Sequence, residues 1–384
     1  MGADTRWGNA VTVRNRIARV VGITVMGPVL IVSGCTASDS PPDPAPDALA
    51  PIPEQPVAAP PSDNRTGSLP PDCASTITEA RLAAAALARL QPGSTLCVSG
   101  DQLTDAKLQI TVSGRPGQPI TIVSDGATVR SMNVRADHVV IQGLRFGDGD
   151  GLTMAGRGLV ARNNVIYNAT EDGLACLGCV DTIIESNTVQ GADGTGIYLA
   201  GERITARGNT ISESVLRTQG DADGIRFFGS GHRLTGNTIK DIKASGYRDE
   251  GPHTDCFQTY NTADDPPTYD VIIAGNVCTN VDVQCLIATA NERGAQAAPA
   301  GRTAIIFEDN TCEVNGSQAV FLENFPRVII RGNRFSGPSD RAVQLSAGST
   351  ECAVIGNTVT GRMRPYEVDR QSRPGLQEAG NTGS

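Results

Sequence analysis

The chain has 384 residues and a formal net charge of −9, with 43 Gly, 23 Pro, 4% aromatic residues and 19% charged residues. This balance does not suit a strongly basic nucleic-acid-binding protein or a Leu-rich helical bundle. The length would accommodate two domains, but a repeat array can use the same length as one unit. The internal organisation of the chain therefore has to distinguish two domains from one repeat array.

Residues 1–34 have the pattern of an export signal. Four Arg residues precede the apolar run 20–32, which is too short to cross a bilayer as a helix but suits the core of a signal peptide. The run ends in VSGC at 32–35, which resembles a bacterial lipoprotein signal. The resemblance implies that Cys35 is lipidated and anchors the exported chain to the outer face of the bacterial membrane, with ordinary secretory cleavage nearby as the alternative. Loss of this segment lowers the net charge from −9 to −12, so an acidic polymer would need a local cationic pocket or a bound metal.

Residues 35–71 are rich in Pro, Ala, Asp and Ser, as in PPDPAPDALAPIPEQPVAAPP. A segment with so little to bury is predicted to be a disordered linker that holds a folded domain away from the membrane. After it, Thr76 and Glu79 form a capping-box pattern, and apolar residues recur on one helical face until Pro92. This pattern predicts one short N-terminal capping helix.

Short Val-, Ile- and Thr-rich runs then repeat around an Asn. The repeated Asn residues are Asn164, Asn187, Asn209, Asn237, Asn276, Asn310, Asn333 and Asn357. A period near 23 residues with three short strands predicts a parallel β-helix of about ten coils, whereas a propeller blade would need roughly 40 residues. We therefore predict an all-β domain over residues 72–365, made by a single chain winding as a parallel β-helix, and a disordered tail over 366–384.

Each Asn is expected at a sharp corner, because Asn tolerates the left-handed backbone region, and its amide can join a ladder along the axis. Two further registers are apolar and are predicted to face inward. The first, two residues after the Asn, comprises Ile166, Val189, Ile211, Ile239, Cys278, Cys312, Phe335 and Val359; the second comprises Leu174, Ile197, Ile225, Phe257, Leu286, Val320 and Val343.

The segments LQPGSTLCVSG, VSGRPGQPITIVS and DHVVIQGLRF resemble the opening coils of secreted polysaccharide lyases of the right-handed parallel β-helix class, including chondroitinase-B-like and alginate-lyase-like proteins. The resemblance covers roughly residues 72–365 and implies a right-handed coil. Its motifs are specific for the fold and weak for the activity, because non-catalytic β-helix proteins share them.

Ten Cys residues with an export signal indicate an oxidising compartment. Cys256 and Cys285 share one register in neighbouring coils, as do Cys278 and Cys312, so the coil spacing predicts a disulfide in each pair. Cys73 and Cys97 flank the predicted helix and are a third candidate pair. The C-x-x-C of Cys176 and Cys179 has no second pair or nearby His to complete a zinc site, and Cys352 is expected to be a buried thiol.

Three successive coils between Asn209 and Asn310 are longer than 23 residues, and insertions in solenoids often border the binding face. They are expected to wall a groove whose polar floor is formed by Tyr198, Arg226 and Gln258. At one corner of the same coils lie acidic residues and an imidazole: Asp172, Asp193, Asp221, Asp223, His253, Asp255 and Asp282.

Elimination of a 4-linked sugar from a uronic acid needs neutralisation of the carboxylate, a base for the C5 proton and an acid for the leaving oxygen. The candidate proton-transfer and charge-neutralising residues are His253, Lys243, Tyr247 and Arg226; the candidate substrate-binding residues are Tyr198, Gln258, Tyr260 and Arg248. Asp221, Asp223 and Asp255 offer the oxygen ligands that calcium prefers, so calcium is a candidate cofactor. The string YRDEGPHTD loosely resembles the Tyr and Pro-His neighbourhood of alginate C5-epimerases, although Gly251 stands where an acid precedes the Pro.

Structural roles compete with these assignments. Asp172 and Asp223 precede Gly at a corner and could accept backbone hydrogen bonds, and Arg226 could pair with Asp223 or Asp255. His138 and His232 lie at ordinary strand positions. Polygalacturonase-like hydrolases share the fold, but their paired-Asp and Gly-His-Gly signatures are missing here.

The sequence thus predicts a monomeric cell-surface lipoprotein, held to the membrane by its lipid only, with no nucleic-acid partner. It is expected to act on an acidic, uronate-containing polysaccharide by C5 proton abstraction, as a lyase or an epimerase. The alternative is a non-catalytic β-helix that binds a glycan or an envelope component through the same groove.

Overall fold

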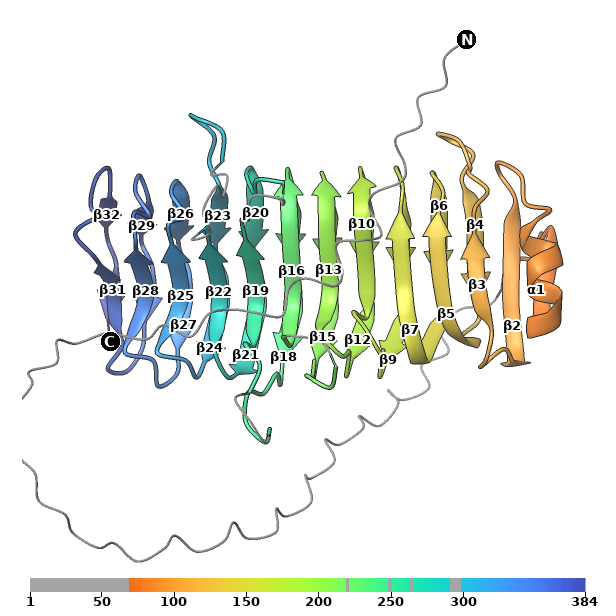
Figure 1. Cartoon of the computed structure of the whole chain (residues 1–384), viewed down its shortest axis with the longest axis horizontal. Helices are drawn as coiled ribbons and strands as arrows, with labels where there is room; N and C mark the ends of the chain where they lie inside the picture. Colours follow the sequence, from red (N-terminus) through yellow and green to blue (C-terminus); the bar gives the residue numbers. More distant parts are fainter. Residues whose placement is uncertain (1–68, 219–220, 248–250, 263–265, 291–297, 384) are drawn as a thin grey trace, which may run out of the picture. The chain divides into compact units, whose positions relative to one another are not determined.

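The computed structural model describes residues 69–383 apart from 219–220, 248–250, 263–265 and 291–297. These residues form one stack of coils made of parallel strands (Figure 1). The export signal, Cys35 and most of the predicted linker lie outside the described residues. Within the described part, no helix is both long enough and apolar enough to cross a bilayer.

One strand of every coil belongs to a thirteen-stranded sheet, so the stack has thirteen coils where the repeat predicted about ten. Its strands, in order, are β1 (Ser75–Glu79), β2 (Thr95–Gln102), β4 (Ile120–Ser124), β6 (Val139–Gln142), β8 (Val160–Arg162), β11 (Ile183–Glu185), β14 (Thr205–Arg207), β17 (Arg233–Thr235), β20 (Val271–Ala274), β23 (Ile305–Glu308), β26 (Val328–Arg331), β29 (Ala353–Ile355) and β32 (Gln377–Ala379).

The remaining strands form a twenty-stranded sheet with two ladders. Ladder 1 comprises β3 (Lys107–Ile110), β5 (Thr128–Arg135), β7 (Arg145–Ala155), β10 (Leu174–Val180), β13 (Thr195–Glu202), β16 (Asp223–Ser230), β19 (Asp255–Tyr260), β22 (Gln284–Thr289), β25 (Gln318–Glu323), β28 (Arg341–Ser346) and β31 (Arg364–Val368). Ladder 2 starts from the first half of β7 and continues through β9 (Val165–Tyr167), β12 (Thr188–Gln190), β15 (Thr210–Ser212), β18 (Thr238–Lys240), β21 (Val277–Val281), β24 (Thr311–Val314), β27 (Arg334–Ser336), β30 (Thr358–Val359) and β33 (Thr382–Gly383).

The ends of the domain differ from the prediction. Residues 75–79 pair with β2 as a strand, and the helix α1 (Ala80–Leu87) starts only after Glu79, which makes no side-chain cap. Thr76 and Glu79 therefore do not form a capping box, because both residues belong to a strand that pairs with β2. Residues 366–384 were expected to be disordered, but β31, β32 and β33 continue the stack there.

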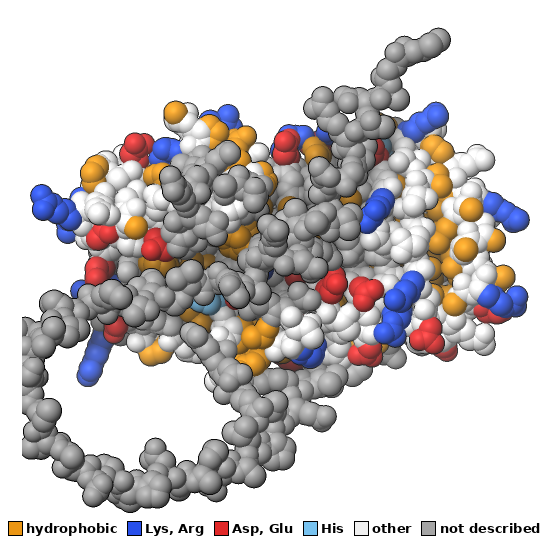
Figure 2. Space-filling view, viewed as in Figure 1, with side chains coloured by type: hydrophobic (Ala, Val, Ile, Leu, Met, Phe, Trp, Pro, Cys, Tyr) orange, Lys and Arg blue, Asp and Glu red, His pale blue; other side chains and the backbone are white. Residues whose placement is uncertain are grey.

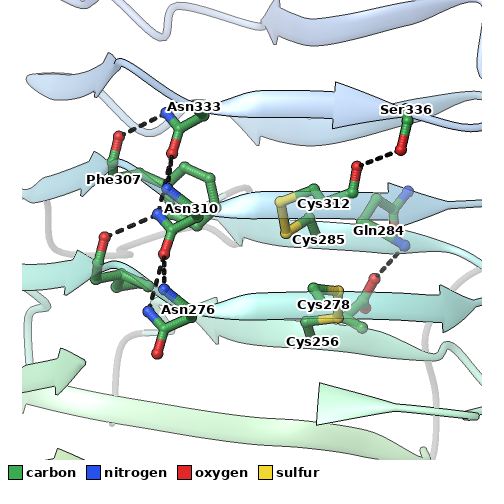
Figure 3. Close-up of a disulfide and its surroundings, with 12 residues drawn as sticks. Cys256, Asn276, Cys278, Gln284, Cys285, Phe307, Asn310, Cys312, Asn333 and Ser336 are labelled. Atoms are coloured by element: carbon green, nitrogen blue, oxygen red, sulfur yellow. Dashed lines mark hydrogen bonds between the residues drawn. A yellow bond between two sulfur atoms is a disulfide. The ribbon is translucent and has the colours of Figure 1, made fainter. Parts of the chain in front are cut away.

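A ladder of buried Asn side chains runs along one corner of the stack, as predicted (Figure 3). Asn310 is representative: its amide donates to Asn333 Oδ1 and to the carbonyl of Ile273, both at 3.0 Å. Its own oxygen accepts the backbone N–H of Asn276 at 2.9 Å. The ladder also includes Asn381, where the same Gly-Asn-Thr string recurs beyond the predicted domain. Each amide thus satisfies backbone groups that would otherwise be unpaired inside the corner.

The left-handed residue at this corner is the one before each Asn, which corrects the expected role of the Asn backbone. Asn163 has φ 54° and Gly208 has φ 61°, whereas no Asn of the ladder has a positive φ. Gly occupies this preceding position in six of the nine coils because a residue without Cβ adopts φ > 0 without strain. The Asn is selected for its amide, and the turn itself is made one residue earlier.

The two apolar registers form the core as predicted. Leu174, Ile197 and Ile225 are direct register partners, and the column continues through Phe257, Leu286, Val320 and Val343, all without exposed surface. The register two residues after each Asn is buried in the same way. Stacking at about 4.8 Å places these side chains in one continuous column.

Four disulfides are present among the described residues. One joins Cys73 to Cys97, as predicted. The other two predicted disulfides, Cys256–Cys285 and Cys278–Cys312, are wrong. Cys256 bonds Cys278 and Cys285 bonds Cys312, so each bridge joins two strands of one coil across its corner (Figure 3). All four side chains point inward at one corner, where the partner on the next strand of the same coil is reached as readily as the register partner above.

The remaining cysteines have structural roles. Cys176 and Cys179 are buried and bonded to each other, so the C-x-x-C is a local bridge across an irregularity in β10. Cys352 is a buried free thiol, as expected, and burial raises its pKa to about 11. A thiol with so high a pKa carries almost no reactive thiolate at neutral pH.

The Asn ladder generates a stability prediction. Asn237→Ala removes the amide that donates to Ala206 and Asn276 and the oxygen that accepts from Asn209, which leaves several buried groups unpaired. We expect the free energy of unfolding in guanidinium chloride to fall by roughly 2–4 kcal/mol. Asn163→Gly is the control, because it changes an exposed Asn with positive φ and should leave stability unchanged or slightly raised. Equal losses for the two variants would contradict the assigned roles.

Candidate functional site

The predicted polar floor lies on the outer face of ladder 1. Tyr198 on β13, Arg226 on β16 and Gln258 on β19 are direct register partners in three consecutive coils. They alternate with the inward residues Ile197, Ile225 and Phe257, because successive side chains of a strand point to opposite faces. The same strands are contiguous near the middle of the stack in Figure 1.

Arg226 is held between two acids. Its Nε donates to Asp223 Oδ2 at 3.0 Å, its Nη2 donates to Asp221 Oδ2 at 3.1 Å, and Nη2 also bonds Asp223 Oδ2. The Asp223 side chain is fully buried, whereas those of Arg226 and Asp221 are 15% and 29% exposed. The predicted pairing of Arg226 with Asp223 is therefore present, and the described bonds use Nε and Nη2 while leaving Nη1 available to a ligand.

Asp172, Asp223 and Asp255 lie two residues before the inward apolar residue of their strands, and each accepts a backbone N–H of the next coil. Asp172 Oδ1 accepts the N–H of Thr195 at 3.0 Å, and Asp223 Oδ1 accepts the N–H of Asp255 at 3.1 Å. Asp255 Oδ1 in turn accepts the N–H of Gln284 at 3.0 Å (Figure 3). The structural role considered for Asp172 and Asp223 is thus present, and for Asp223 it coexists with the ion pair to Arg226.

Asp255 is the most strongly perturbed acid of this row. It has no exposed surface, and within the part of the chain that the structure describes its Oδ2 has no hydrogen-bond partner. Burial raises its pKa well above the ordinary value, and the nearby Asp223 raises it further. Burial also raises the pKa of Asp223 to about 6, although the positive charge of Arg226 opposes that rise. The Asp223 and Asp255 pair therefore favours holding a proton near neutral pH.

His253 lies one coil away from the Asp221–Asp223 segment. Its backbone carbonyl accepts the N–H of Ala222 at 3.0 Å, which fixes the two segments side by side. Its side chain is exposed, unlike those of Asp223 and Asp255. Among the predicted proton-transfer residues it is the one with an exposed side chain, and its backbone lies beside the segment that leads into Arg226.

Lys243 and Tyr247 have other partners. Lys243 Nζ forms an ion pair with Asp282 at 3.1 Å and also bonds Asn280, and Asp282 accepts the N–H of Ala244 as well. Tyr247 Oη accepts the N–H of Leu216 at 3.0 Å, and partial burial raises the pKa of this phenol. Both side chains therefore fasten the insertion that contains them.

The first long coil is fastened by Asp193. This buried acid accepts the N–H of Arg217 at 2.7 Å and both the N–H and the hydroxyl of Thr218. Because Tyr247 bonds Leu216 in the same loop, the insertions of two successive coils are connected. This connection places the backbone that leads into Asp221 and Asp223.

An aromatic group beside Arg226 was missed by the sequence analysis. Phe228 lies on the outer side of β16, with the ring of Tyr198 at 5.6 Å and that of Tyr260 at 4.9 Å between centroids. Tyr260 also interacts electrostatically with Arg226. The signal was available, since Phe228 follows Arg226 by two residues in IRFFG and so shares its face. Aromatic rings beside a cation are suited to stacking on sugar rings and to polar contact with their substituents.

Gln258 contributes an unused acceptor to this surface. It is 6% exposed, and its Oε1 has no hydrogen-bond partner among the described residues. A buried acceptor without a partner is costly, so a ligand hydroxyl or a water that donates to it would be favourable. Arg248 was also predicted to bind substrate, but it lies outside the described residues.

The three aspartates do not form an open calcium site as they lie. Asp221 and Asp223 both bind the guanidinium of Arg226, and Asp255 is fully buried behind them. Arg226 thus places a positive charge among the carboxylates that were predicted to bind calcium, and calcium binding stays a prediction. Among the described residues, the one group of clustered ligand atoms is that of Cys256, Cys278 and Cys285, which are all in disulfides.

The other two His residues lie outside this surface. His232 is buried, with Nδ1 accepting the N–H of Ile204 at 3.2 Å and Nε2 lying 2.9 Å from the carbonyl of Phe228. Burial lowers its pKa, so it is neutral and structural. His138 occupies a left-handed corner position at φ 54°.

On the face shown in Figure 2, basic and acidic side chains lie intermixed where the described residues are visible. No large field of one sign is therefore apparent on that part of the surface. Recognition of a charged ligand would have to depend on local groups such as Arg226.

The raised pKa values generate a pH prediction. A carboxyl group whose pKa is raised on folding stabilises the native state fully below its unfolded pKa, and this contribution is lost as the pH rises through the folded pKa. The free energy of unfolding should therefore increase as the pH falls from about 7 to about 5. Asp255→Asn should flatten this increase and raise stability at about pH 7, because it removes the buried charge.

Asp282→Asn is the matched control for the pH experiment. Hydrogen bonds from Asn315, Lys243 and Ala244 lower the pKa of Asp282 despite partial burial, so this acid stabilises the fold at neutral pH. Its substitution should lower stability at about pH 7 and leave the increase toward about pH 5 in place. A wild-type stability that falls over that range would contradict the assignment.

Comparison with known proteins agrees with this architecture. A family model described as the right handed beta helix region matches residues 121–264 and 150–359. No curated protein sequence matches the chain.

Three similar solved structures illustrate the likeness. The catalytic unit of an α-1,3-glucanase from Streptomyces thermodiastaticus strain HF3-3 has a TM-score of 0.54 at 13% identity, covering 85% of this chain and 70% of that one. A tailspike mutant of E. coli bacteriophage HK620 in complex with a pentasaccharide has a TM-score of 0.52 at 11% identity, covering 84% and 65%. An alginate lyase from Paenibacillus sp. str. FPU-7 has a TM-score of 0.49 at 15% identity, covering 80% and 98%. Identities this low show a shared fold only. The family match covers more than half of the chain, and the chain therefore belongs to the right-handed β-helix family.

Proposed function

We propose that this protein acts on an acidic, uronate-containing polysaccharide at the outer face of β13, β16 and β19, by removing the C5 proton of a uronate. The observation that carries the proposal is the partly exposed Arg226 beside the aromatic group, with the exposed His253 on the adjoining coil. Two of the proteins with a similar fold are an α-1,3-glucanase and a tailspike in complex with a pentasaccharide. A saccharide ligand is consistent with this likeness.

Each group has a role in this scheme. Arg226 Nη1 neutralises the uronate carboxylate, which acidifies the C5 proton. His253 takes that proton as the base. In a lyase, the electron pair forms the C4=C5 bond as the C4–O bond breaks, and Tyr260 gives its proton to the leaving oxygen. In an epimerase, a proton returns to C5 on the opposite face and no bond to oxygen breaks.

Asp221 and Asp223 have a supporting role. They hold the guanidinium in place through three hydrogen bonds, so that the orientation of Arg226 does not have to be established when substrate binds. Tyr198 is proposed to be the hydrophobic platform for a sugar ring, supported from beneath by the buried Phe228, and Gln258 accepts from a hydroxyl. Lys243 and Tyr247 shape the insertion and are no longer assigned to proton transfer.

The alternative is a non-catalytic glycan-binding protein. Two observations favour it: Arg226 already binds two acids, and two of the four predicted reactive residues have structural partners. Such a protein would bind the same polysaccharide on the same rings without changing it.

The experiment is incubation with pectate, alginate and glycosaminoglycans, with and without calcium, followed by ultraviolet absorbance of the unsaturated product and by solvent proton exchange at C5. His253→Ala should lower the rate by at least about 100-fold, while His138→Asn, which changes a His at a left-handed corner remote from the site, should leave it unchanged. Tyr260→Phe should retain binding and lose lyase turnover, and Tyr260→Ala should weaken binding. Binding without product or exchange would establish the alternative, and absence of binding to all three polymers would refute both.

We also propose that the chain is a lipoprotein anchored through Cys35. The support is the VSGC string after a basic and apolar leader. In a bacterial host, the protein should incorporate a labelled fatty acid and sediment with membranes. Cys35→Ser should lose the label and enter the soluble exported fraction, whereas unlabelled wild-type protein would contradict the anchor.

A further inference from the structure

The outer face of the thirteen-stranded sheet carries a stripe of aliphatic side chains. One outward position is stacked in register over eight consecutive strands from β8 to β29, and six of its eight residues are apolar: Val160, Ile183, Thr205, Arg233, Ile272, Ile306, Ile329 and Ala353. The Val and Ile side chains in this stripe are half-buried, so part of their apolar surface is exposed to solvent. Among the described residues, no element packs over them.

A row of charges runs beside this stripe. The outward position two residues later on the same strands is occupied by Arg162, Glu185, Arg207, Thr235, Ala274, Glu308, Arg331 and Ile355. Glu185 pairs with Arg207 at 2.5 Å and Glu308 pairs with Arg331 at 2.6 Å within the chain. Both ion pairs have the same order along the axis, Glu before Arg, with the uncharged Thr235 and Ala274 between them.

This order makes the face complementary to itself. A twofold axis between β17 and β20, parallel to the strands, brings β11 of one copy against β26 of the other and β14 against β23. Glu185 then faces Arg331 of the second copy, and Arg207 faces Glu308. In the stripe, Ile183 faces Ile329 and Val160 faces Ala353. Nearer the axis, Arg233 faces Ile272 and Thr205 faces Ile306.

The corner at the edge of the sheet follows the same symmetry. Asp181 and Arg327 occupy equivalent corner positions on either side of the axis, and so do Gly158 and Glu351. The twofold therefore opposes Asp181 to Arg327, and it brings Arg157, which pairs with Asp181 at 2.6 Å in its own chain, toward Glu351.

The charge order also specifies the register. A shift of one copy by one coil in one direction would place Arg207 opposite Arg331, and a shift in the other direction would place Glu185 opposite Glu308. Like charges held face to face are unfavourable, so both shifted arrangements are disfavoured. Of these three arrangements, only the unshifted one places opposite charges face to face.

We propose that this face is the interface of a homodimer, in which two copies pack sheet against sheet and run antiparallel along the stack. Eight coils of about 4.8 Å and a strip about 15 Å wide bury roughly 600 Å² per copy, which is at the lower end for a stable interface. A second copy of this chain is the occupant because the face is complementary to itself. The proposal replaces the monomer expected from the sequence and does not rest on the proposed function.

A hollow at one end of the face fits this arrangement. It has a volume of about 250 Å³ and is lined in part by Arg302, Arg327, Ile329, Glu351 and Ala353. These residues lie on or beside β26 and β29, which the twofold places against β11 and β8. The second copy's Ile183 lies over this hollow and covers apolar surface there.

The experiment is sedimentation equilibrium of the full chain over a range of concentrations. The wild type should have the mass of a dimer, and Ile183→Asp should raise the dissociation constant by at least about tenfold because it places a charge against Ile329. Val277→Asp is the matched control: Val277 is 40% exposed on ladder 2, away from this face, and its substitution should leave the dimer intact. Unchanged circular dichroism and melting of Ile183→Asp establish that it is folded.

A cross-linking experiment covers the case in which Ile183→Asp fails to fold. Thr235 and Ala274 face each other across the proposed axis. An intermolecular disulfide should therefore form when Thr235→Cys and Ala274→Cys proteins are mixed, and much less when either is alone. A monomer, a trimer, a dimer indifferent to Ile183→Asp, or cross-links of equal yield in the single variants would each overturn the proposal.

Discussion

The structure depends on hydrogen bonding between successive coils, which converts separation along the chain into contact in space. The Asn ladder is its most constrained element, since each amide bonds the next Asn and a backbone carbonyl while its oxygen accepts a backbone N–H. Asn237 and Asn276 are 39 residues apart and still bond directly, because the extra residues of that coil leave the corner unchanged. An inserted segment is therefore displaced outward, and the residues at its base remain in register.

This constraint explains why chemistry gathers around Arg226. The insertions of neighbouring coils are fastened by Asp193, Tyr247 and Lys243, and between them β16 and β19 present Arg226 and Gln258. Burial makes charge expensive here, so Asp223 is paired with Arg226 and the pKa values of both Asp223 and Asp255 are raised. The result is an orientated cation beside aromatic rings, with the exposed His253 one coil away, which is an arrangement suited to binding a charged sugar.

The sequence was sufficient for the fold and for register, because a period near 23 residues aligns Asn, apolar and polar positions independently. Tyr198, Arg226 and Gln258 were predicted as neighbours on this basis, and they are. Register alone does not fix where a side chain finds its partner. The disulfides therefore connect Cys256 with Cys278 within a coil, and Tyr247 bonds Leu216 instead of reaching Arg226. Phe228 was missed because the candidate residues were selected among charged and polar side chains, although Phe228 lies on the same face of β16 as Arg226.

The central claim is that β13, β16 and β19 form one binding surface even though long insertions separate them in sequence. Hydrogen–deuterium exchange with and without an oligouronate tests it most directly, since each strand lies in a separate peptide. The account predicts that the ligand slows exchange in residues 195–202, 223–230 and 255–260 together, with the thirteen-stranded sheet unaffected. Protection confined to one of these strands, or protection on the opposite sheet, would contradict it.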